Sequence, residues 1–336
     1  MRRPATATAA SLIAASLLAG CADGGAPERV EATITTPSPT RDPLPLPPGA
    51  LLDEPSGPPA TPYMPEKLDW EGSLNPRLAP AGAPTPNVDR IRKRGRLIVG
   101  IDQSLYLLSY RDTATGHLRG LEVDLAQAIA DDIFGTESGR GTLDLRFVDS
   151  AARADALNRG DVDVVIRTMS ITPERAQQIE FSTPYLETRV RVLAPKDRGI
   201  EGLNDLDGKT VCIVDGTNLA QMARTFAPNS SLLRTRSWSD CLMSTQQFQA
   251  DAIMADDAIL AGIAAQDPYT DILPGSLSTQ YYGVGLPKGG DDIVRQVNST
   301  IERMRNDGSL RQLYATWLGG SVVDASPPAL RYRTEE

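Results

Sequence analysis

The chain has 336 residues, of which 34 are basic and 43 acidic, with one histidine, three cysteines and a formal net charge of −9. This acidic balance does not suit the phosphates of a polynucleotide, which need clustered cations, so we expect no nucleic-acid partner. One histidine excludes a multi-histidine metal site, and no C-x-x-C pair supports a zinc ribbon or a thioredoxin-type centre. We therefore expect neither a metal nor a cofactor.

The first twenty residues have the pattern of an export signal. Two arginines precede an uncharged stretch, residues 4–20, which is too short to cross a membrane comfortably. The sequence Leu18–Cys21 resembles the lipobox of bacterial lipoproteins, in which cleavage precedes the cysteine and its thiol carries diacylglycerol. We expect residues 1–20 to be a signal peptide and Cys21 to anchor an extracytoplasmic protein to the cell membrane. The alternative is a secretory signal with a chance cysteine.

The next segment, residues 21–89, is dominated by proline. Residues 21 to 90 hold 16 of the 26 prolines, and no period of 2 or 3.6 is present from which a sheet or helix is built. We expect a lipid-anchored, largely disordered linker that holds the folded part away from the membrane. A disordered interaction tail is the alternative for the same composition.

Export also decides how the remaining cysteines are interpreted. Outside the cytosol, Cys212 and Cys241 are the only pair left to form a bridge. The loop that it closes has about 28 residues, and the chain-entropy account gives such a bridge about 3 kcal/mol. We expect this disulfide, with two buried free thiols as the alternative.

Regular patterning begins near Arg94. Short apolar or alternating runs predict strands, and apolar residues at helical spacing predict helices. The predicted strands are residues 96–101, 143–148 and 162–166, and the predicted helices are residues 120–130 and 151–158. This alternation predicts an α/β body with a largely parallel sheet.

A second series of the same kind begins near Leu203. The predicted strands are residues 209–214, 232–235 and 252–256, and the predicted helices are residues 216–226 and 239–248. Strand-like runs at residues 190–194 and 281–286 bracket this second body, and helices are predicted at residues 293–304 and 310–318. Two α/β bodies joined by two extended passages predict a hinge with a cleft between two lobes.

Polar residues follow several of these strands. In open α/β sheets, ligands bind beyond the carboxyl ends of the strands and near helix N-termini. Asp102, Ser170–Thr172, Gly216–Asn218 and Asp256 fall at such positions. Each alone is typical of a helix cap or a turn, but their shared position makes them candidate ligand-binding residues.

Several segments, taken in order along the chain, resemble segments of the extracellular solute-binding proteins of family 3, which capture polar amino acids for import systems. The likeness covers about residues 90–318 and is carried by Leu97–Asp102, Gly120–Ala126, Gly160–Asp163, Ser170–Arg175, Phe181–Tyr185, Leu206–Lys209, Gly216–Thr217, Asp251–Asp257, Asp307–Gly308 and Trp317. The lipobox and linker are similar to those of actinobacterial glutamine/glutamate-binding lipoproteins.

The resemblance implies an α/β fold of the two-lobed, periplasmic-binding-protein-like kind (type II) with a two-strand hinge. Lobe 1 is then expected to comprise residues 90–193 and 284–320, and lobe 2 residues 194–283. Residues 321–336 are expected to be a C-terminal tail.

An amino-acid ligand needs a planar fork of donors for its α-carboxylate and a carboxylate for its ammonium. Arg175 offers the fork, with support from Ser170 and Thr172, and Asp256 offers the carboxylate. The resemblance implies these two roles, and it adds the backbone carbonyl of Thr168 as an acceptor for the ammonium. The alternative for Arg175 is a surface arginine paired with a neighbouring glutamate. Ligand contacts from both lobes would favour closure.

Further candidate ligand-binding residues are Thr217, which the resemblance implies, and Asp102, Asn218 and Tyr106. Tyr106 is included because Leu105 and Tyr106 stand where many family members have an aromatic residue and a proline. How the aliphatic part of the ligand is packed therefore depends on residues that differ from the family pattern.

Arg153 is the candidate for side-chain recognition. It lies in a segment where members that prefer acidic amino acids carry an arginine directed at the side-chain carboxylate of the ligand. The alternative is a helix-surface arginine beside Asp149 or Asp155. Arg111, Arg119 and Arg167 are expected to be solvated rather than in contact.

These residues favour a monomeric, non-enzymatic receptor for aspartate or glutamate, with their amides as further ligands. It would pass the ligand, or the signal of its binding, to a transmembrane permease or sensor. One alternative is an enzyme on the same fold, similar to periplasmic dehydratases, with Asp102 and Glu122 as the only nominated acids. The other is a scaffold that binds protein, which has no physical need for opposed charges at Arg175 and Asp256.

Overall fold

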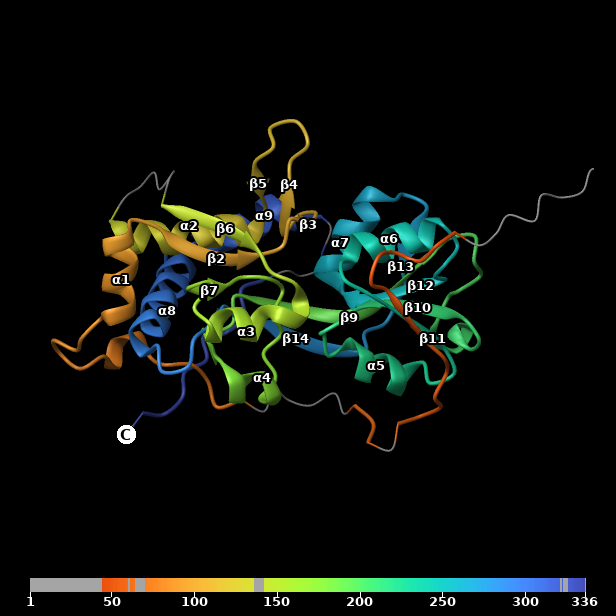
Figure 1. The fold of residues 1–336 in the computed structure, drawn as a ribbon, viewed down its shortest axis with the longest axis horizontal. Coiled ribbons are helices and arrows are strands. Elements are labelled where there is room, and N and C mark those ends of the chain that lie inside the picture. The colour runs from red at the N-terminus through yellow and green to blue at the C-terminus, as the bar shows by residue number, and fades with distance from the viewer. Residues whose placement is uncertain are drawn as a thin grey trace, which may run out of the picture. The chain divides into compact units, whose positions relative to one another are not determined.

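The computed structural model describes residues 44–59, 61–63, 70–135, 142–320, 322 and 326–335. The expected signal peptide and Cys21 lie outside these residues. Two lobes, each built around one sheet with helices on its faces, make up the described part (Figure 1). Within it, no helix has the length and apolar character needed to cross a membrane. The two-lobed α/β fold expected from the sequence is confirmed.

Lobe 1 contains a five-stranded sheet in the order β6-β2-β7-β15-β8. Its strands are β2 (Leu97–Ile101), β6 (Leu143–Phe147), β7 (Val164–Val165), β8 (Glu180–Phe181) and β15 (Gly285–Leu286). Strand β2 is parallel to β6 and β7, whereas β15 runs antiparallel to β7 and β8. A small antiparallel sheet adds β3 (Ser104–Leu105), β4 (Ser109–Arg111) and β5 (Leu118–Arg119).

The helices of lobe 1 pack around this sheet and against one another. They are α1 (Pro86–Arg94), α2 (Leu121–Phe134), α3 (Arg153–Asn158), α4 (Pro173–Gln178), α8 (Asp291–Asn306) and α9 (Ser309–Trp317), with 3-10 turns at Pro76–Leu78 and Ser150–Ala152. In α2, Leu121, Leu125 and Ile129 are fully buried. Their spacing of four residues puts them on one helical face, which is the pattern that predicted this helix.

Lobe 2 contains a seven-stranded sheet in the order β1-β11-β10-β12-β9-β13, with β14 also paired to β9. Its strands are β1 (Leu51–Asp53), β9 (Leu186–Pro195), β10 (Thr210–Val214), β11 (Ser231–Thr235), β12 (Ala252–Asp256), β13 (Thr270–Ile272) and β14 (Ser278–Tyr282). Its helices are α5 (Leu219–Phe226), α6 (Trp238–Gln246) and α7 (Asp257–Gln266), with a 3-10 turn at Leu203–Leu206. Strands β11, β10 and β12 are parallel, which repeats the plan of lobe 1.

Two extended passages cross between the lobes. One leads from β8 to β9 and the other from β14 to β15. They are bonded to each other, because the Ser182 amide donates to the Val284 carbonyl at 3.0 Å and the Tyr185 amide donates to the Tyr282 carbonyl at 2.9 Å. The hinge therefore consists of paired backbone segments.

The lobe boundaries differ from the expected ones. The predicted end of lobe 1 at residue 193 falls inside β9, which pairs along its length with β12, β13 and β14 and so belongs wholly to lobe 2. The run at residues 281–286, expected as one strand, is divided between β14 and β15 because the chain changes sheets at Gly283. Helix α7 and the small sheet were not predicted.

The proline-rich segment is ordered where the structure describes it, which corrects part of the expected linker. Strand β1 pairs with β11, and Pro76–Leu78 forms a 3-10 turn against lobe 1. The expected C-terminal tail also packs, because Tyr332 forms a parallel bridge with Ser73 and Glu335 forms an ion pair with Arg295. Proline-rich composition failed as a guide here because backbone pairing with the edge of β11 is enough to order Leu51–Asp53, although the side chains of Leu51 and Leu52 remain exposed.

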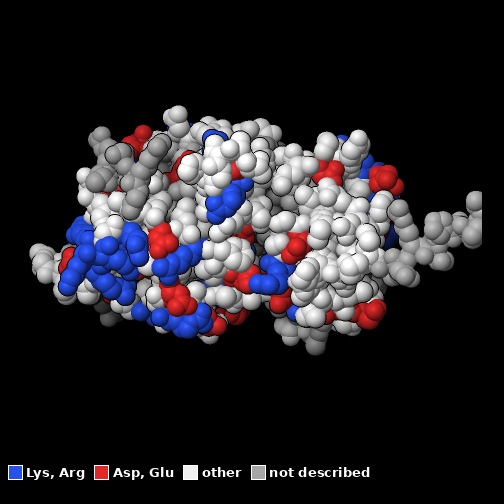
Figure 2. Space-filling view, turned by 45° about the horizontal axis from the view of Figure 1, so that its top comes forward, with Lys and Arg blue, Asp and Glu red and all other residues white. Residues whose placement is uncertain are grey.

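Lys and Arg side chains gather at the lobe 1 end of the molecule (Figure 2). Several of them are already neutralised, since Arg94 pairs with Asp163, Arg146 with Asp144 at 3.0 Å and Arg159 with Asp161 at 2.8 Å. These ion pairs therefore offset part of the positive charge that gathers at this end of lobe 1.

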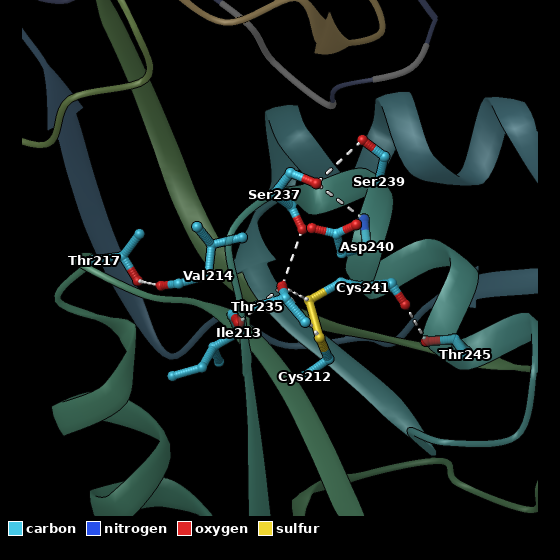
Figure 3. Close-up of a disulfide and its surroundings, with 10 residues drawn as sticks. All are labelled: Cys212, Ile213, Val214, Thr217, Thr235, Ser237, Ser239, Asp240, Cys241 and Thr245. Atoms are coloured by element: carbon cyan, nitrogen blue, oxygen red, sulfur yellow. Dashed lines mark hydrogen bonds between the residues drawn. A yellow bond between two sulfur atoms is a disulfide. The ribbon is translucent and has the colours of Figure 1, made fainter. Parts of the chain in front are cut away.

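The expected disulfide is confirmed, and it lies inside lobe 2 (Figure 3). Cys212 on β10 is bonded to Cys241 on α6, with 5.6 Å between the Cα atoms, and both residues are fully buried. The Thr235 hydroxyl on the neighbouring strand β11 lies 3.3 Å from the Cys241 sulfur and donates to the Ser237 carbonyl at 3.0 Å. The bridge thus ties the central strand of lobe 2 to the helix that covers it.

We expect the double substitution Cys212→Ser and Cys241→Ser to lower the free energy of unfolding by about 3 kcal/mol, because the unfolded chain regains the freedom of the closed loop. Urea denaturation monitored by circular dichroism measures this change. A reducing agent should bring the natural protein to the same midpoint and leave the double variant unchanged. Equal midpoints for the oxidised protein and the double variant would contradict the expectation.

Candidate functional site

Polar side chains from the two lobes meet where the carboxyl ends of their strands face each other. The carbonyl of Gly216, in the turn after β10 of lobe 2, accepts from Arg153 Nη2 at 3.3 Å and from Arg175 Nη2 at 3.4 Å. Both arginines belong to lobe 1, on α3 and α4. Two guanidinium groups therefore converge on one backbone oxygen of the opposite lobe.

Arg153 is almost completely buried, with 3% of its surface exposed. Its Nε donates to the Ser150 carbonyl at 2.8 Å, and its Nη1 donates to the Arg167 and Thr168 carbonyls at 3.1 and 3.4 Å. Among the described residues it has no ion-pair partner. Burial lowers its pKa well below the usual value, and the nearby charges of Arg175 and Arg167 lower it further. A buried cation without a counterion is costly, so this position favours an anion.

Arg175 is half-buried, and α4 fixes its backbone. The Thr172 hydroxyl caps the helix by accepting from the Arg175 amide at 3.3 Å. Its Nη1 donates to the Ser170 carbonyl at 2.8 Å, and in the described part of the chain its guanidinium has no carboxylate within ion-pair distance. The predicted alternative of a pair with Glu174 or Glu180 is therefore not formed.

Asp256 supplies the opposite charge from lobe 2, where it ends β12. It is 5% exposed, and its Oδ2 accepts from the Tyr282 hydroxyl at 2.7 Å, while its Oδ1 has no hydrogen-bond partner among the residues that the structure describes. Burial raises the pKa of this carboxyl to about 7, and the nearby Asp257 charge adds to the rise, whereas Arg175 and Arg153 oppose it. The site thus combines two cations without ion-pair partners and one carboxylate oxygen without a donor.

Thr168 lies in a backbone conformation that few non-glycine residues adopt, with φ of 41°. Its amide donates to Glu122 Oε1 at 2.6 Å, and the same carboxyl accepts from the Tyr185 hydroxyl at 2.6 Å and the Ser109 hydroxyl at 3.2 Å. Glu122 is fully buried, which raises its pKa. This carboxyl therefore holds the turn that directs the Thr168 carbonyl toward Arg153, a role that sequence analysis did not predict.

The structure does not support Asp102 as a ligand-binding residue. Its carboxylate forms an ion pair with Arg167 at 2.5 Å and accepts from the Gln103 amide, the Ser104 amide and the Ser104 hydroxyl, each at 2.7 Å. Asp102 and Arg167 are both fully buried. The expectation that Arg167 is solvated was also wrong, because Asp102 provides the counterion that makes its burial tolerable.

The remaining candidates lie around the site with different degrees of engagement. Ser170 is buried beside the hinge, opposite Tyr282 in an isolated bridge. The Thr217 hydroxyl donates to the Val214 carbonyl at 2.6 Å, and Asn218 Nδ2 donates to Gln280 at 3.0 Å. The Tyr106 ring packs against Tyr110 in a tilted arrangement, with 4.8 Å between ring centres and 57° between the ring planes. Ligand contact by these residues stays a prediction.

The lobes are in close contact around the site. A Cβ atom added to Gly216 would lie 2.5 Å from the Cα of Ala151, and one added to Gly262 would lie 2.4 Å from the carbonyl oxygen of Tyr106. Arg236 of lobe 2 also pairs with Asp149 of lobe 1 at 2.7 Å. The described arrangement is therefore a closed one, in which glycine is required where the two backbones meet.

We expect Gly216→Ala to keep the lobes apart, because the new methyl group collides with the backbone of Ala151 and because Gly216 has a φ of 71° that disfavours other residues. Small-angle X-ray scattering in the presence of ligand should show a larger radius of gyration than for the natural protein. Gly208→Ala is the matched control, since it has a φ of 70° and open space around its Cβ position. Equal radii for Gly216→Ala and the natural protein would contradict the expectation.

The profile of the bacterial extracellular solute-binding proteins, family 3, matches residues 97–320. The chain belongs to this family. A glutamine-binding protein of Geobacillus stearothermophilus is 33% identical over 219 residues, which are 65% of this chain and 82% of the relative. The glutamate-binding protein GluB of Corynebacterium efficiens is 31% identical over 231 residues, which are 63% and 76% of the two chains.

A solved structure supports the same architecture. A mutant of ArgBP from T. maritima superposes with a TM-score of 0.63 at 27% identity, covering 69% of this chain and 99% of that chain. The family 3 region of this chain begins at β2 and ends just after α9. The proline-rich segment, α1 and residues 326–335 are thus additions to the matched region.

Proposed function

We propose that this family 3 solute-binding protein is a non-catalytic receptor for an amino acid with an acidic side chain, glutamate or aspartate. The observation that carries the proposal is the convergence of Arg153 and Arg175 on one point between the lobes, opposite Asp256. A ligand with two carboxylates and one ammonium carries the complementary set of charges.

The geometry supports one assignment of the three ligand groups. Arg175, with Ser170 and Thr172 beside it, takes the α-carboxylate. The Thr172 hydroxyl fixes the backbone of Arg175 at the start of α4, and the Ser170 carbonyl holds its guanidinium. Asp256 takes the ammonium through its free Oδ1, and the Thr168 carbonyl provides a second acceptor. Arg153 takes the side-chain carboxylate. Thr217 and Asn218 contact the ligand from lobe 2, and Tyr106 packs against its aliphatic part.

The relatives support an amino-acid ligand, since they are named glutamine-binding and glutamate-binding proteins. An enzyme is less well supported. The two carboxyls nominated as catalytic acids, Asp102 and Glu122, are each buried in lobe 1 and hydrogen-bonded on both oxygens. A scaffold that binds only protein does not explain why the charges of Arg153 and Asp256 are buried, because burial of a charge costs free energy.

The cellular setting follows from the sequence. We propose that Cys21 carries the lipid anchor and that the receptor works as a monomer outside the cytoplasm. Its partner is then a transmembrane permease or a transmembrane sensor that distinguishes the closed, ligand-bound form from the open form.

Thermal unfolding of the purified full-length protein with each of the twenty amino acids tests the proposal. At about 100 times the dissociation constant, binding to the native state adds about 2.7 kcal/mol, which raises the Tm by about 5 °C or more for a protein of this size. Glutamate or aspartate should give the largest shift, followed by their amides. A shift only with lysine or arginine, or with none of the twenty, would overturn the proposal.

A further inference from the structure

The described part of the proline-rich segment, residues 44–59 and 61–63, docks on lobe 2, and we call it the docked linker. Strand β1 pairs antiparallel with β11, and Asp53 forms ion pairs with Arg234 at 2.9 Å and Arg224 at 3.8 Å. Gln249 Nε2 donates to the carbonyls of Leu44 and Pro45, each at 2.9 Å. Backbone pairing, ion pairs and side-chain hydrogen bonds thus hold this segment on one lobe.

Tyr63 lies at the end of the docked linker and connects the linker, through Gln280, to Asn218 of the proposed ligand site. The Tyr63 amide donates to the Thr225 hydroxyl at 2.8 Å, and the Tyr63 hydroxyl lies 3.2 Å from the Ser278 hydroxyl. Gln280 Nε2 donates to the Tyr63 hydroxyl at 3.1 Å, while Gln280 Oε1 accepts from Asn218 at 3.0 Å. Asn218 stands two residues after Gly216, whose carbonyl faces both arginines.

The chain then attaches to lobe 1. The Ser73 hydroxyl donates to the Phe181 carbonyl at 2.6 Å and accepts from Asn298 Nδ2 at 2.7 Å. Nine residues lie between Tyr63 and Ser73, and the ten steps from one residue to the next span at most about 35 Å. The described contacts of Tyr63 and Ser73 thus lie on different lobes.

The docked linker also supports an ion pair that joins the lobes. A Cβ atom on Gly49 would lie 3.2 Å from Cδ of Arg236, so the linker turn rests on the stem of this arginine. The Arg236 guanidinium pairs with Asp149 of lobe 1 at 2.7 Å. The Arg236 side chain thus contacts both the docked linker and lobe 1.

From these contacts we propose that docking of the linker is coupled to ligand binding: the docked linker stabilises the closed form, and ligand binding in turn strengthens its docking. Tyr63 acts as a positioning residue for the hydrogen-bonded pair Gln280 and Asn218. Asp53 holds β1 on β11 through its ion pair with Arg234. The inference rests on the proposed function, because closure is its link to the ligand. Coupling between two equilibria is reciprocal, so each process must strengthen the other by the same factor.

Two measurements on the full-length protein test the coupling. The first is hydrogen–deuterium exchange of peptides covering residues 44–63, with and without saturating glutamate. We expect the amides of β1 to exchange about fivefold more slowly with glutamate. The second is isothermal titration calorimetry with glutamate for the double variant Asp53→Ala and Tyr63→Phe, for which we expect about fivefold weaker binding.

Glu54→Ala is the matched control, because Glu54 is an exposed acid beside Asp53 and makes no ion pair among the described residues. It should bind glutamate as the natural protein does. If the natural protein binds glutamate but β1 exchanges at the same rate with and without it, and the double variant binds as tightly as the control, the coupling is overturned and the receptor function stands. If the natural protein binds no acidic amino acid, the receptor function itself is overturned.

Discussion

Replacing Arg153 with methionine is expected to weaken glutamate binding by about a hundredfold or more, because the side-chain carboxylate loses its buried cation. Glutamine, which lacks this charge, should lose much less affinity. The Tm of the ligand-free protein should change little, since the loss of the hydrogen bonds from Arg153 to four backbone carbonyls is offset by removal of a buried guanidinium that has no counterion among the described residues. Isothermal titration calorimetry with both ligands and thermal unfolding measure these effects.

Arg159→Met is the control for this experiment. Arg159 follows the same helix, α3, but is exposed and paired with Asp161 at 2.8 Å, so its loss should leave both affinities unchanged. An equal loss of glutamate and glutamine binding in Arg153→Met would show that Arg153 does not distinguish the side chains. It would then be reassigned to the α-carboxylate.

Glutamate affinity is also expected to fall as the pH is lowered through 7, because only the ionised Asp256 attracts the ligand ammonium. Burial raises the pKa of Asp256 in the ligand-free protein to about 7. Below that pH the ionised fraction falls about tenfold per unit, so binding at pH 5 should be about a hundredfold weaker than at pH 8. The charged neighbours Arg153 and Arg175 keep their charge throughout this range.

The stability of the ligand-free protein should change in the opposite direction. The folded-state pKa of Asp256 lies above its ordinary value of 3.8. The folded state therefore holds this proton more tightly, and the Asp256 contribution to stability is lost as the pH rises from about 4 to 7. Asp256→Asn should remove both effects and weaken glutamate binding by about a hundredfold at pH 8.

Calorimetry from pH 5 to 8 and urea denaturation over the same range measure these two trends. Asp271→Asn is the control, because Asp271 on β13 is an exposed acid of lobe 2 that pairs with Lys196 at 3.6 Å and takes no part in the site. The same pH profile of glutamate binding in Asp256→Asn and in the natural protein would show that another group is responsible.

The elements that the sequence predicted best are those in which the spacing of apolar residues corresponds to the face that is buried in the structure. Helix α2 has one buried face, so its period is visible in the sequence. Helix α7 was missed because its residues Ala258–Ile263 are all buried, and a helix that is apolar on every side has no period to detect. Strand β1 was missed because three residues gain their structure only from the edge of β11.

The site shows the same distinction. The position of Asp256 at a strand end and the motif around Arg175 were sufficient to nominate both residues. Asp102 has an equivalent position, but its charge is neutralised by Arg167, which lies 65 residues further along the chain. A sequence pattern does not reveal which carboxylates have an internal partner, because that pairing depends on how the strands are ordered in the sheet.

Strand β1 has a further consequence, because it covers the outer edge of the lobe 2 sheet. Without it, β11 would become the edge strand and would expose the backbone groups of Ser231–Thr235, with the apolar Leu232 and Leu233 among them. Uncovered edges of this kind are templates for pairing with a second molecule. A chain shortened to the family 3 region is therefore expected to self-associate through β11, because the strand that covers this edge would be missing.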